Sequence, residues 1–404
     1  MTHLWALAWK GSLRSVVCVF AAASYLQAQG PGNCSPPKEM DDPGPGRTPA
    51  QIANLKGAWF ARQGNYPCAI AAFESALRAG PDLLEARYNL GLALLEDRQL
   101  QRAARELDAV VKSLPGRAEP RLALALVHEE SGNLEQAESE LRTAAQADPR
   151  SASVQHQLGE VLHKEKRYTA AAACLRLAVE LEPANPSHSV LLAETLYDNG
   201  RAAEAIETLE KTVSAYPRSA LAQSNLGTLY ARAKRYEDSL EHFRAAVELD
   251  PADDVTRLSL GKALIGLDRY GDSLPVLNEV LRRKERNAEA LSLRGMAYRG
   301  LADFEKAARD LRVAAELQPD DFQTRYNLGF VLARTGRLEE ARRHLEKARS
   351  LQPDSQEAQF QLANVLRRLN QPELAARELA DFERRKKQDE LGDMASMTAS
   401  RANQ

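Results

Sequence analysis

The residues with the clearest chemical potential are His156, Glu160 and His163. Spacings of four and three residues place all three on one face of an α-helix, and two imidazoles with a carboxylate can bind a divalent ion. A helix with a polar face produces the same spacing easily, and the sequence shows no further ligand. We therefore expect no metal or other cofactor. A metal-dependent site or an enzyme accessory subunit centred on these residues is kept as an alternative.

The rest of the chain offers little catalytic chemistry. It contains no phosphate-binding loop, no nucleophile motif and no paired-cysteine motif. Apolar residues make up 44% of the chain, charged residues 27%, and the formal net charge is −2. That balance predicts a soluble globular type of protein and gives no electrostatic case for binding nucleic acid. We expect a protein that is not an enzyme.

Residues 220–253 show which elements must position these side chains. At helical period the segment forms two amphipathic helices joined by a short turn, and Pro251 ends the second helix. With Ala220 as position 1, small residues stand at position 8 of the first helix (Gly227) and position 20 of the second (Ser239). Small side chains there let the two helices approach closely, while Phe243 at position 24 fills the space around their contact.

The same unit recurs every 34 residues without insertion or deletion. Ten repeats begin at residues 50, 84, 118, 152, 186, 220, 254, 288, 322 and 356. Position 8 is glycine or alanine throughout: Gly57, Gly91, Ala125, Gly159, Ala193, Gly227, Gly261, Gly295, Gly329 and Ala363. Position 24 is phenylalanine or leucine throughout: Phe73, Leu107, Leu141, Leu175, Leu209, Phe243, Leu277, Leu311, Leu345 and Leu379. Among the first nine repeats, the closing proline is absent only at Glu285.

This period and residue pattern resemble the tetratricopeptide repeat (TPR) family. The resemblance covers residues 50–389 and implies an all-α fold, a right-handed superhelical α-solenoid of antiparallel helix pairs with a long concave groove. It also implies that function lies on the inner face of the first helices, at positions 2, 5, 6, 9, 12 and 13. The matching positions are packing positions, so they say nearly nothing about chemistry.

The two ends of the chain differ from the repeats. Residues 1–28 have a basic start, an apolar run at 15–26 and a small residue at Ala28, which is typical of a secretory signal peptide. An uncleaved membrane anchor formed by residues 15–26 is the alternative. Residues 29–49 are rich in proline and glycine and are expected to be a flexible linker, and residues 390–404 a disordered tail. We expect an exported protein, located in the periplasm, the secretory lumen or outside the cell.

Three cysteines remain after removal of a signal peptide. Cys34 in the linker could reach Cys68 in the first repeat, but independent thiols are the simpler expectation. Cys174 is expected to be a packing residue.

Two sets of residues are candidates for partner binding. Asparagines recur at position 6, and their amides could pair with the backbone of an extended peptide or simply face solvent. They are Asn89, Asn225 and Asn327. Apolar side chains are also expected on the groove, where they would contact a partner or be buried by stacking. Near the first repeats these are Tyr88, Leu92 and Leu126; near the last they are Tyr326, Phe330 and Phe360, with Arg367 nearby.

These observations favour a non-catalytic interaction scaffold that holds an extended peptide or partner protein in its groove. We expect a monomeric array or a component of a larger complex, with no membrane contact beyond an N-terminal anchor. A structural spacer in an envelope assembly is a further alternative.

Overall fold

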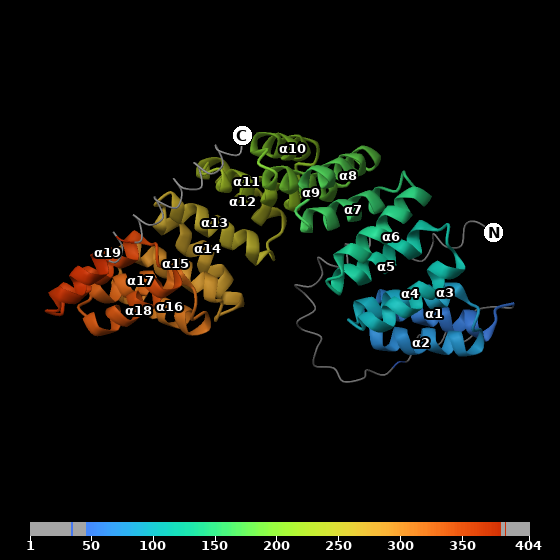
Figure 1. The fold of residues 1–404 in the computed structure, drawn as a ribbon, viewed down its shortest axis with the longest axis horizontal. Coiled ribbons are helices and arrows are strands. Elements are labelled where there is room, and N and C mark those ends of the chain that lie inside the picture. Colours follow the sequence, from blue (N-terminus) through green and yellow to red (C-terminus); the bar gives the residue numbers. More distant parts are fainter. Residues whose placement is uncertain (1–33, 35–45, 381–383, 385–404) are drawn as a thin grey trace. The chain divides into compact units, whose positions relative to one another are not determined.

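The computed structural model describes residue 34, residues 46–380 and residue 384 (Figure 1). The described residues are helices and short turns without a strand. They divide into two compact units, Met1–Asn199 and Gly200–Gln404. The predicted all-α solenoid of helix pairs is confirmed.

Each unit is a series of helices joined by short turns. The first unit contains α1 (Pro49–Arg62), α2 (Tyr66–Ala79), α3 (Leu84–Glu96), α4 (Leu100–Ser113), α5 (Ala118–Glu130), α6 (Leu134–Ala147), α7 (Ala152–Lys164), α8 (Tyr168–Leu181) and α9 (Pro186–Asp198). The second contains α10 (Ala202–Ala215), α11 (Ala220–Arg232), α12 (Tyr236–Leu249), α13 (Asp254–Gly266), α14 (Tyr270–Arg283), α15 (Ala288–Gly300), α16 (Phe304–Leu317), α17 (Phe322–Arg334), α18 (Leu338–Leu351) and α19 (Gln356–Arg368). Residues 372–380 are also helical.

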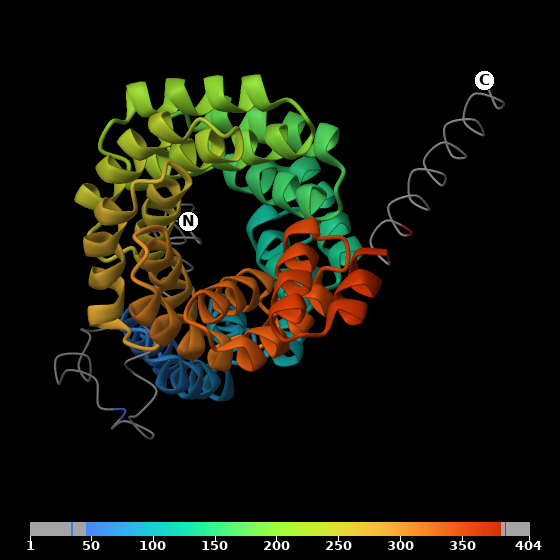
Figure 2. The ribbon, with the colours of Figure 1, turned by 90° about the vertical axis from the view of Figure 1, so that its left-hand side faces the viewer.

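Odd-numbered helices are the first helices of the repeats. Apart from α9 and α19, each packs against the second helix of its own repeat, and successive pairs lie side by side within each unit (Figure 2). From α3 onward every first helix begins at the start of a predicted repeat, and α1 begins one residue earlier, where Thr48 forms a capping box with Gln51.

The two helices of a pair meet where position 8 faces position 24. A Cβ atom added to Gly295 would lie 2.6 Å from Cγ of Leu311, which is closer than atoms can approach. Leu311 itself is completely buried. The absence of a side chain at Gly295 therefore sets how closely α15 and α16 can pack.

A left-handed residue closes the turn within each repeat, at position 15. Glycine occupies it in Gly64, Gly132, Gly200 and Gly336. Other residues adopt the same positive φ in Arg98, Lys166, Lys234, Asp268, Ala302 and Asn370. Because this conformation is costly for residues with a Cβ, these six turns are held by the packing of the helices on either side.

A polar contact joins most repeats to the turn before them. In most repeats the residue at position 4 is arginine or glutamine, and its side chain donates a hydrogen bond to the carbonyl of the proline six residues earlier. The pairs are Arg87 with Pro81, Arg121 with Pro115, Gln155 with Pro149, Gln223 with Pro217, Arg257 with Pro251, Arg325 with Pro319 and Gln359 with Pro353. The repeat preceded by Glu285 has the buried Leu291 at position 4. Proline and donor are thus missing together.

Arg294 departs from the leucine that most repeats carry at position 7. Its guanidinium donates to both carboxylate oxygens of Asp310, at 2.6 and 2.9 Å, and to Oδ1 of Asn278 at 2.7 Å. These hydrogen bonds to the Asp310 carboxylate raise the pKa of Arg294 above its usual value. An ion pair in this repeat replaces part of the apolar contact between α15 and its second helix.

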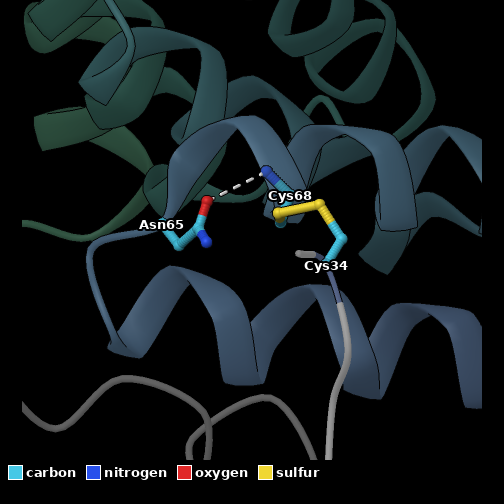
Figure 3. The surroundings of a disulfide bond; sticks show 3 residues. All are labelled: Cys34, Asn65 and Cys68. Carbon is cyan, nitrogen blue, oxygen red and sulfur yellow. Dashed lines mark hydrogen bonds between the residues drawn. A yellow bond between two sulfur atoms is a disulfide. The ribbon is translucent and has the colours of Figure 1, made fainter. Parts of the chain in front are cut away.

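Cys34 and Cys68 form a disulfide bond (Figure 3), with their Cα atoms 5.5 Å apart. Cys68 lies in the first turn of α2, where its backbone N–H donates to Oδ1 of Asn65. The expectation of independent thiols is wrong, because Cys34 lies beside the first turn of α2 and its sulfur atom is bonded to that of Cys68. Cys174 on α8 is a free, half-buried thiol, and burial raises its pKa.

Several predictions made from sequence lie outside the described residues: the signal peptide or anchor, most of the linker and the tail at 390–404. Among the residues that the structure does describe, no helix is both long and apolar enough to cross a bilayer.

Substituting position-8 glycines tests the close contact between paired helices. At Gly159 a new Cβ would meet Cγ of Leu175 at 2.6 Å and the backbone oxygen of Ala171 at 3.2 Å, whereas at Gly261 it would meet only the Leu277 side chain, at 2.8 Å or more. We expect Gly159→Ala to lower the free energy of unfolding by about 1–2 kcal/mol. Gly261→Ala should be within about 0.5 kcal/mol of wild type, because gained helix propensity offsets the milder overlap. Urea denaturation of both variants measures this, and equal stabilities would contradict it.

Acid should destabilise the second unit through His344 on α18. Burial, and the Arg325 guanidinium that donates to its Nδ1 at 3.1 Å, lower the pKa of His344 from 6.5 to about 4. The folded state disfavours the charged imidazole of His344. The stability associated with the neutral form is therefore complete above pH 6.5 and is lost as pH falls toward 4. After allowance for solvent screening of this half-buried group, we expect the free energy of unfolding to fall by about 1–2 kcal/mol.

The variant His344→Gln isolates that contribution. Glutamine retains an acceptor for Arg325 but gains no proton, so its unfolding free energy should change less between pH 6.5 and 4 than that of wild type. Identical pH dependence of the two proteins in thermal denaturation would show that His344 is not the sensitive group.

Candidate functional site

The asparagines predicted to form a ladder make contacts within the protein. Nδ2 of Asn89 donates to Oδ1 of Asn54 at 3.1 Å, and Nδ2 of Asn54 donates to Oε1 of Glu85 at 3.2 Å. This chain of polar groups joins α1 and α3 across successive repeats. Asn89 remains half-buried, so part of its amide is accessible.

The other two asparagines differ in exposure. Nδ2 of Asn225 donates to the carbonyl of Leu221 and the residue is half-buried. Asn327 is 1% exposed, donates to the carbonyl of Gln323 at 2.7 Å and accepts from Arg299. The ladder interpretation is therefore wrong for Asn327, which could meet a peptide backbone only after its surroundings move.

The apolar cluster predicted near the first repeats is largely core. Leu92 is buried in the cluster that contains Phe73 and Leu107, and Tyr88 packs against the same cluster. Burial, and next the Glu119 carboxylate, raise the pKa of Tyr88 to about 12. Leu126 is half-buried. The expectation that Leu92 is exposed is wrong, because stacking of neighbouring repeats covers it.

Acidic side chains on the first helices of this unit are occupied by nearby donors. The carboxylate of Glu119 accepts two hydrogen bonds from Arg117, which lower its pKa. Glu129 accepts from Lys164 and from Gln157 of the next repeat. Glu119 and Glu129, on the inner columns of the first unit, are thus already paired with nearby donors.

In the second unit, Arg299 on α15 organises an aromatic cluster on α17. Its guanidinium lies 4.1 Å from the ring centre of Phe330 and 5.6 Å from that of Tyr326. Tyr326 also stacks on Phe322, with ring centres 6.0 Å apart. Both Tyr326 and Phe330 are half-buried, so the rings are held in place while part of their surface is open.

Exposed groups continue this surface. Phe360 on α19 is 52% exposed, and Arg334 and Arg367, at positions 13 and 12 of their repeats, are exposed. An open hollow of about 660 Å³ lies beside Tyr326 and Phe322, lined also by Gln323, residues 351–355 and Glu357. Aromatic side chains, two exposed cations and a hollow are therefore all found on α17, α19 and the turn that precedes α19.

The trio His156, Glu160 and His163 does not form one site. His156 is buried and its Nδ1 lies 3.0 Å from Nδ1 of His188 on α9. Glu160 pairs with Lys164 at 3.3 Å. His163 instead faces α9, where Glu194 and Asp198 offer carboxylates. The metal alternative as first formulated is wrong, because the three side chains contact different partners and only His163 belongs to a group of three possible metal ligands among the described residues.

Sequence reasoning missed Glu194 and Asp198. They stand at positions 9 and 13 of one repeat and His163 at position 12 of the repeat before it, all on groove columns. Comparing these columns between adjacent repeats, rather than along one helix, would have found the group.

Tandem antiparallel helix pairs of constant length define this chain as an α-solenoid. Three sequence profiles that each describe the tetratricopeptide repeat match it, one at residues 60–118 and 190–254, another at 94–159, 230–297 and 299–359, and a third at 152–185. The chain belongs to the tetratricopeptide repeat family. Repeat proteins of this kind present extended concave surfaces to binding partners, so membership supports a protein-interaction scaffold.

Solved structures with similar folds share little sequence with this chain. MamA (residues 41 to the end) from Desulfovibrio magneticus RS-1 is 23% identical, with a TM-score of 0.38, over 42% of this chain and 95% of that one. Yeast Tom70 is 15% identical, TM-score 0.41, over 82% and 91%. The Cut9–Hcn1 hetero-tetramer of APC/C is 15% identical, TM-score 0.47, over 86% and 59%. A search of curated proteins finds no match.

Proposed function

We propose that the protein is a non-catalytic scaffold that binds an extended, acidic peptide segment of a partner protein. The observation that carries this proposal is the surface of Tyr326, Phe330, Phe360, Arg334 and Arg367, which we call the α17–α19 face. Partly open rings beside exposed guanidinium groups suit a segment with apolar or aromatic anchors flanked by carboxylates.

Three features support this choice of partner. All five side chains stand at groove columns of the family, at positions 5, 9, 12 and 13. Arg299 already orders two of the rings, so less side-chain entropy is lost when a ligand binds. The hollow beside Tyr326 leaves room for an anchoring side chain. Exposed arginines would mainly steer and orient an acidic segment.

A selected peptide provides the test. Peptides that bind the purified protein would be enriched from a random display library, and their Kd measured by fluorescence anisotropy. We expect enrichment of acidic sequences with aromatic or large apolar residues. Tyr326→Ala with Phe360→Ala should weaken binding at least about tenfold, as loss of anchor contacts does. Arg334→Glu with Arg367→Glu should weaken it similarly and reduce its salt dependence.

Matched controls are available on the same unit. Leu301→Ala removes another exposed apolar side chain, from the turn before α16, and Arg309→Glu reverses an exposed charge on α16. Both should leave Kd within about twofold. If the α17–α19 variants bind every selected peptide like wild type, the proposal fails and a structural spacer becomes the better hypothesis.

We further propose that the protein is exported. The Cys34–Cys68 disulfide supports this, since such bonds persist in oxidising compartments, and the signal-peptide pattern at residues 1–28 agrees with it. A membrane anchor at residues 15–26 is the alternative form of the same proposal.

Thiol labelling with mass spectrometry tests export. In protein isolated from its own cells, alkylation without reduction should modify Cys174 alone, and reduction should make Cys34 and Cys68 reactive as well. An N-terminus following Ala28 would distinguish cleavage from anchoring. Reactive Cys34 and Cys68 before reduction would contradict export.

A further inference from the structure

We infer that His163, Glu194 and Asp198 form a binding site for a divalent transition-metal ion such as Zn²⁺. The ligand atoms of the three side chains all lie within 4.8 Å of one another. They come from α7 and α9, the first helices of successive repeats. Neither the family assignment nor the proposed peptide site requires this group, and it lies in the other unit from the α17–α19 face.

The hydrogen bonds around His163 prepare its Nε2 atom as a ligand. Thr195, fully buried on α9, donates its hydroxyl proton to the carbonyl of Leu191 at 2.8 Å. Its Oγ1 lies 3.0 Å from Nδ1 of His163 and therefore accepts a hydrogen bond from that nitrogen. In the neutral imidazole the proton is then on Nδ1 and the lone pair on Nε2. Histidines that bind metals are typically oriented by such a second hydrogen bond.

The Nε2 lone pair is directed toward carboxylates. Nε2 lies 3.6 Å from Oδ2 of Asp198. That separation exceeds the roughly 2.7–2.9 Å of a charged N–H···O hydrogen bond. It is close to the roughly 3.3 Å that separates two ligands of a tetrahedral ion bound at about 2.0–2.1 Å. A cation between the two atoms would replace the repulsion of lone pair and carboxylate with attraction.

Charge and access also suit a divalent ion. One neutral imidazole and two carboxylates balance a charge of +2. The neighbouring Lys164 ammonium lies 2.5 Å from Oε1 of Glu129 and 3.3 Å from Oε1 of Glu160, so carboxylates outside the group attract its charge. Glu194 is exposed, which leaves a path for the ion and open coordination positions on the groove side. Imidazole with carboxylate ligands favours zinc and its first-row neighbours over calcium or magnesium.

The test uses the full chain without a histidine tag, stripped of metal by EDTA and dialysed. Titration with ZnCl₂ in a calorimeter should show one tight site. Glu194→Gln and Asp198→Asn should each weaken Zn²⁺ binding at least about tenfold. Substitution by Co²⁺ should give the visible absorption of a nitrogen- and oxygen-ligated ion, and His163→Asn should abolish that spectrum.

Variants of Thr195 test whether this residue positions His163 for metal binding or only supports the fold. Thr195→Val keeps the volume of the side chain but cannot accept from Nδ1, so Zn²⁺ binding should weaken about 10- to 100-fold. Thr195→Ser should restore it. Circular dichroism and thermal denaturation without metal identify any variant that fails to fold, and His128→Asn serves as a control histidine outside the site.

Two results would overturn the inference. Absence of Zn²⁺ binding by wild type would mean that His163 and Asp198 form only an ion pair. Binding that is unchanged in the variants at His163, Glu194 and Asp198 would place the metal elsewhere. Because the titration contains no peptide, its outcome is independent of the proposed peptide binding.

Discussion

The fold depends on the close approach of two helices at one point in each repeat. At that point, in the pairs from α1 to α8 and from α11 to α18, a glycine or alanine of the first helix faces a buried leucine or phenylalanine of the second; a Cβ on Gly91, for example, would lie 2.6 Å from Leu107. This contact fixes how the two helices pair, and pairing gives each repeat an apolar edge that it cannot bury alone. The next repeat covers that edge. After stacking, the first-helix residues on the groove side are not required for core packing. These residues are therefore available to bind a partner.

The sequence predicts this level of structure well for a physical reason. Contacts within a repeat join residues sixteen positions apart, such as Gly159 and Leu175, so both partners recur together in the printed sequence and reveal the pairing. The same regularity locates the turns, because proline ends the second helix at nearly every repeat. The starts of the first helices could therefore be predicted to within one residue.

Contacts between repeats were harder to predict. Whether Leu92 or Asn327 is buried depends on how far one repeat overlaps the next, and no spacing within the sequence reports that overlap. The hydrogen bonds to proline carbonyls were missed because their acceptor is a backbone oxygen. Every residue has such an oxygen, so no residue type in the sequence indicates which one accepts. The disulfide was missed because Cys34 precedes the repeats, so no periodic position in the sequence relates it to Cys68. The group around His163 combines residues that no single helix brings together.

The two units present different inner surfaces. In the first, carboxylates such as Glu119 and Glu129 accept hydrogen bonds from nearby donors, and the ligand atoms of His163, Glu194 and Asp198 lie close together. In the second, Arg299 orders aromatic rings beside cations with open faces. A partner would therefore meet surfaces of unlike character on the two units, which suits discrimination between ligands more than general affinity.

The hydrogen bond from position 4 to the preceding proline has a consequence for how such a chain can change in length. Donor and acceptor lie six residues apart and span the junction between two repeats. A duplication or deletion of 34 residues can have its breakpoints anywhere in the repeat. The new junction forms the same hydrogen bond whenever the repeat before it ends in the proline and the repeat after it carries the position-4 donor. The number of repeats can thus vary in evolution or by engineering as a nearly independent quantity. The junction between Glu285 and Leu291 has neither group, so recombination there would produce a junction without this hydrogen bond.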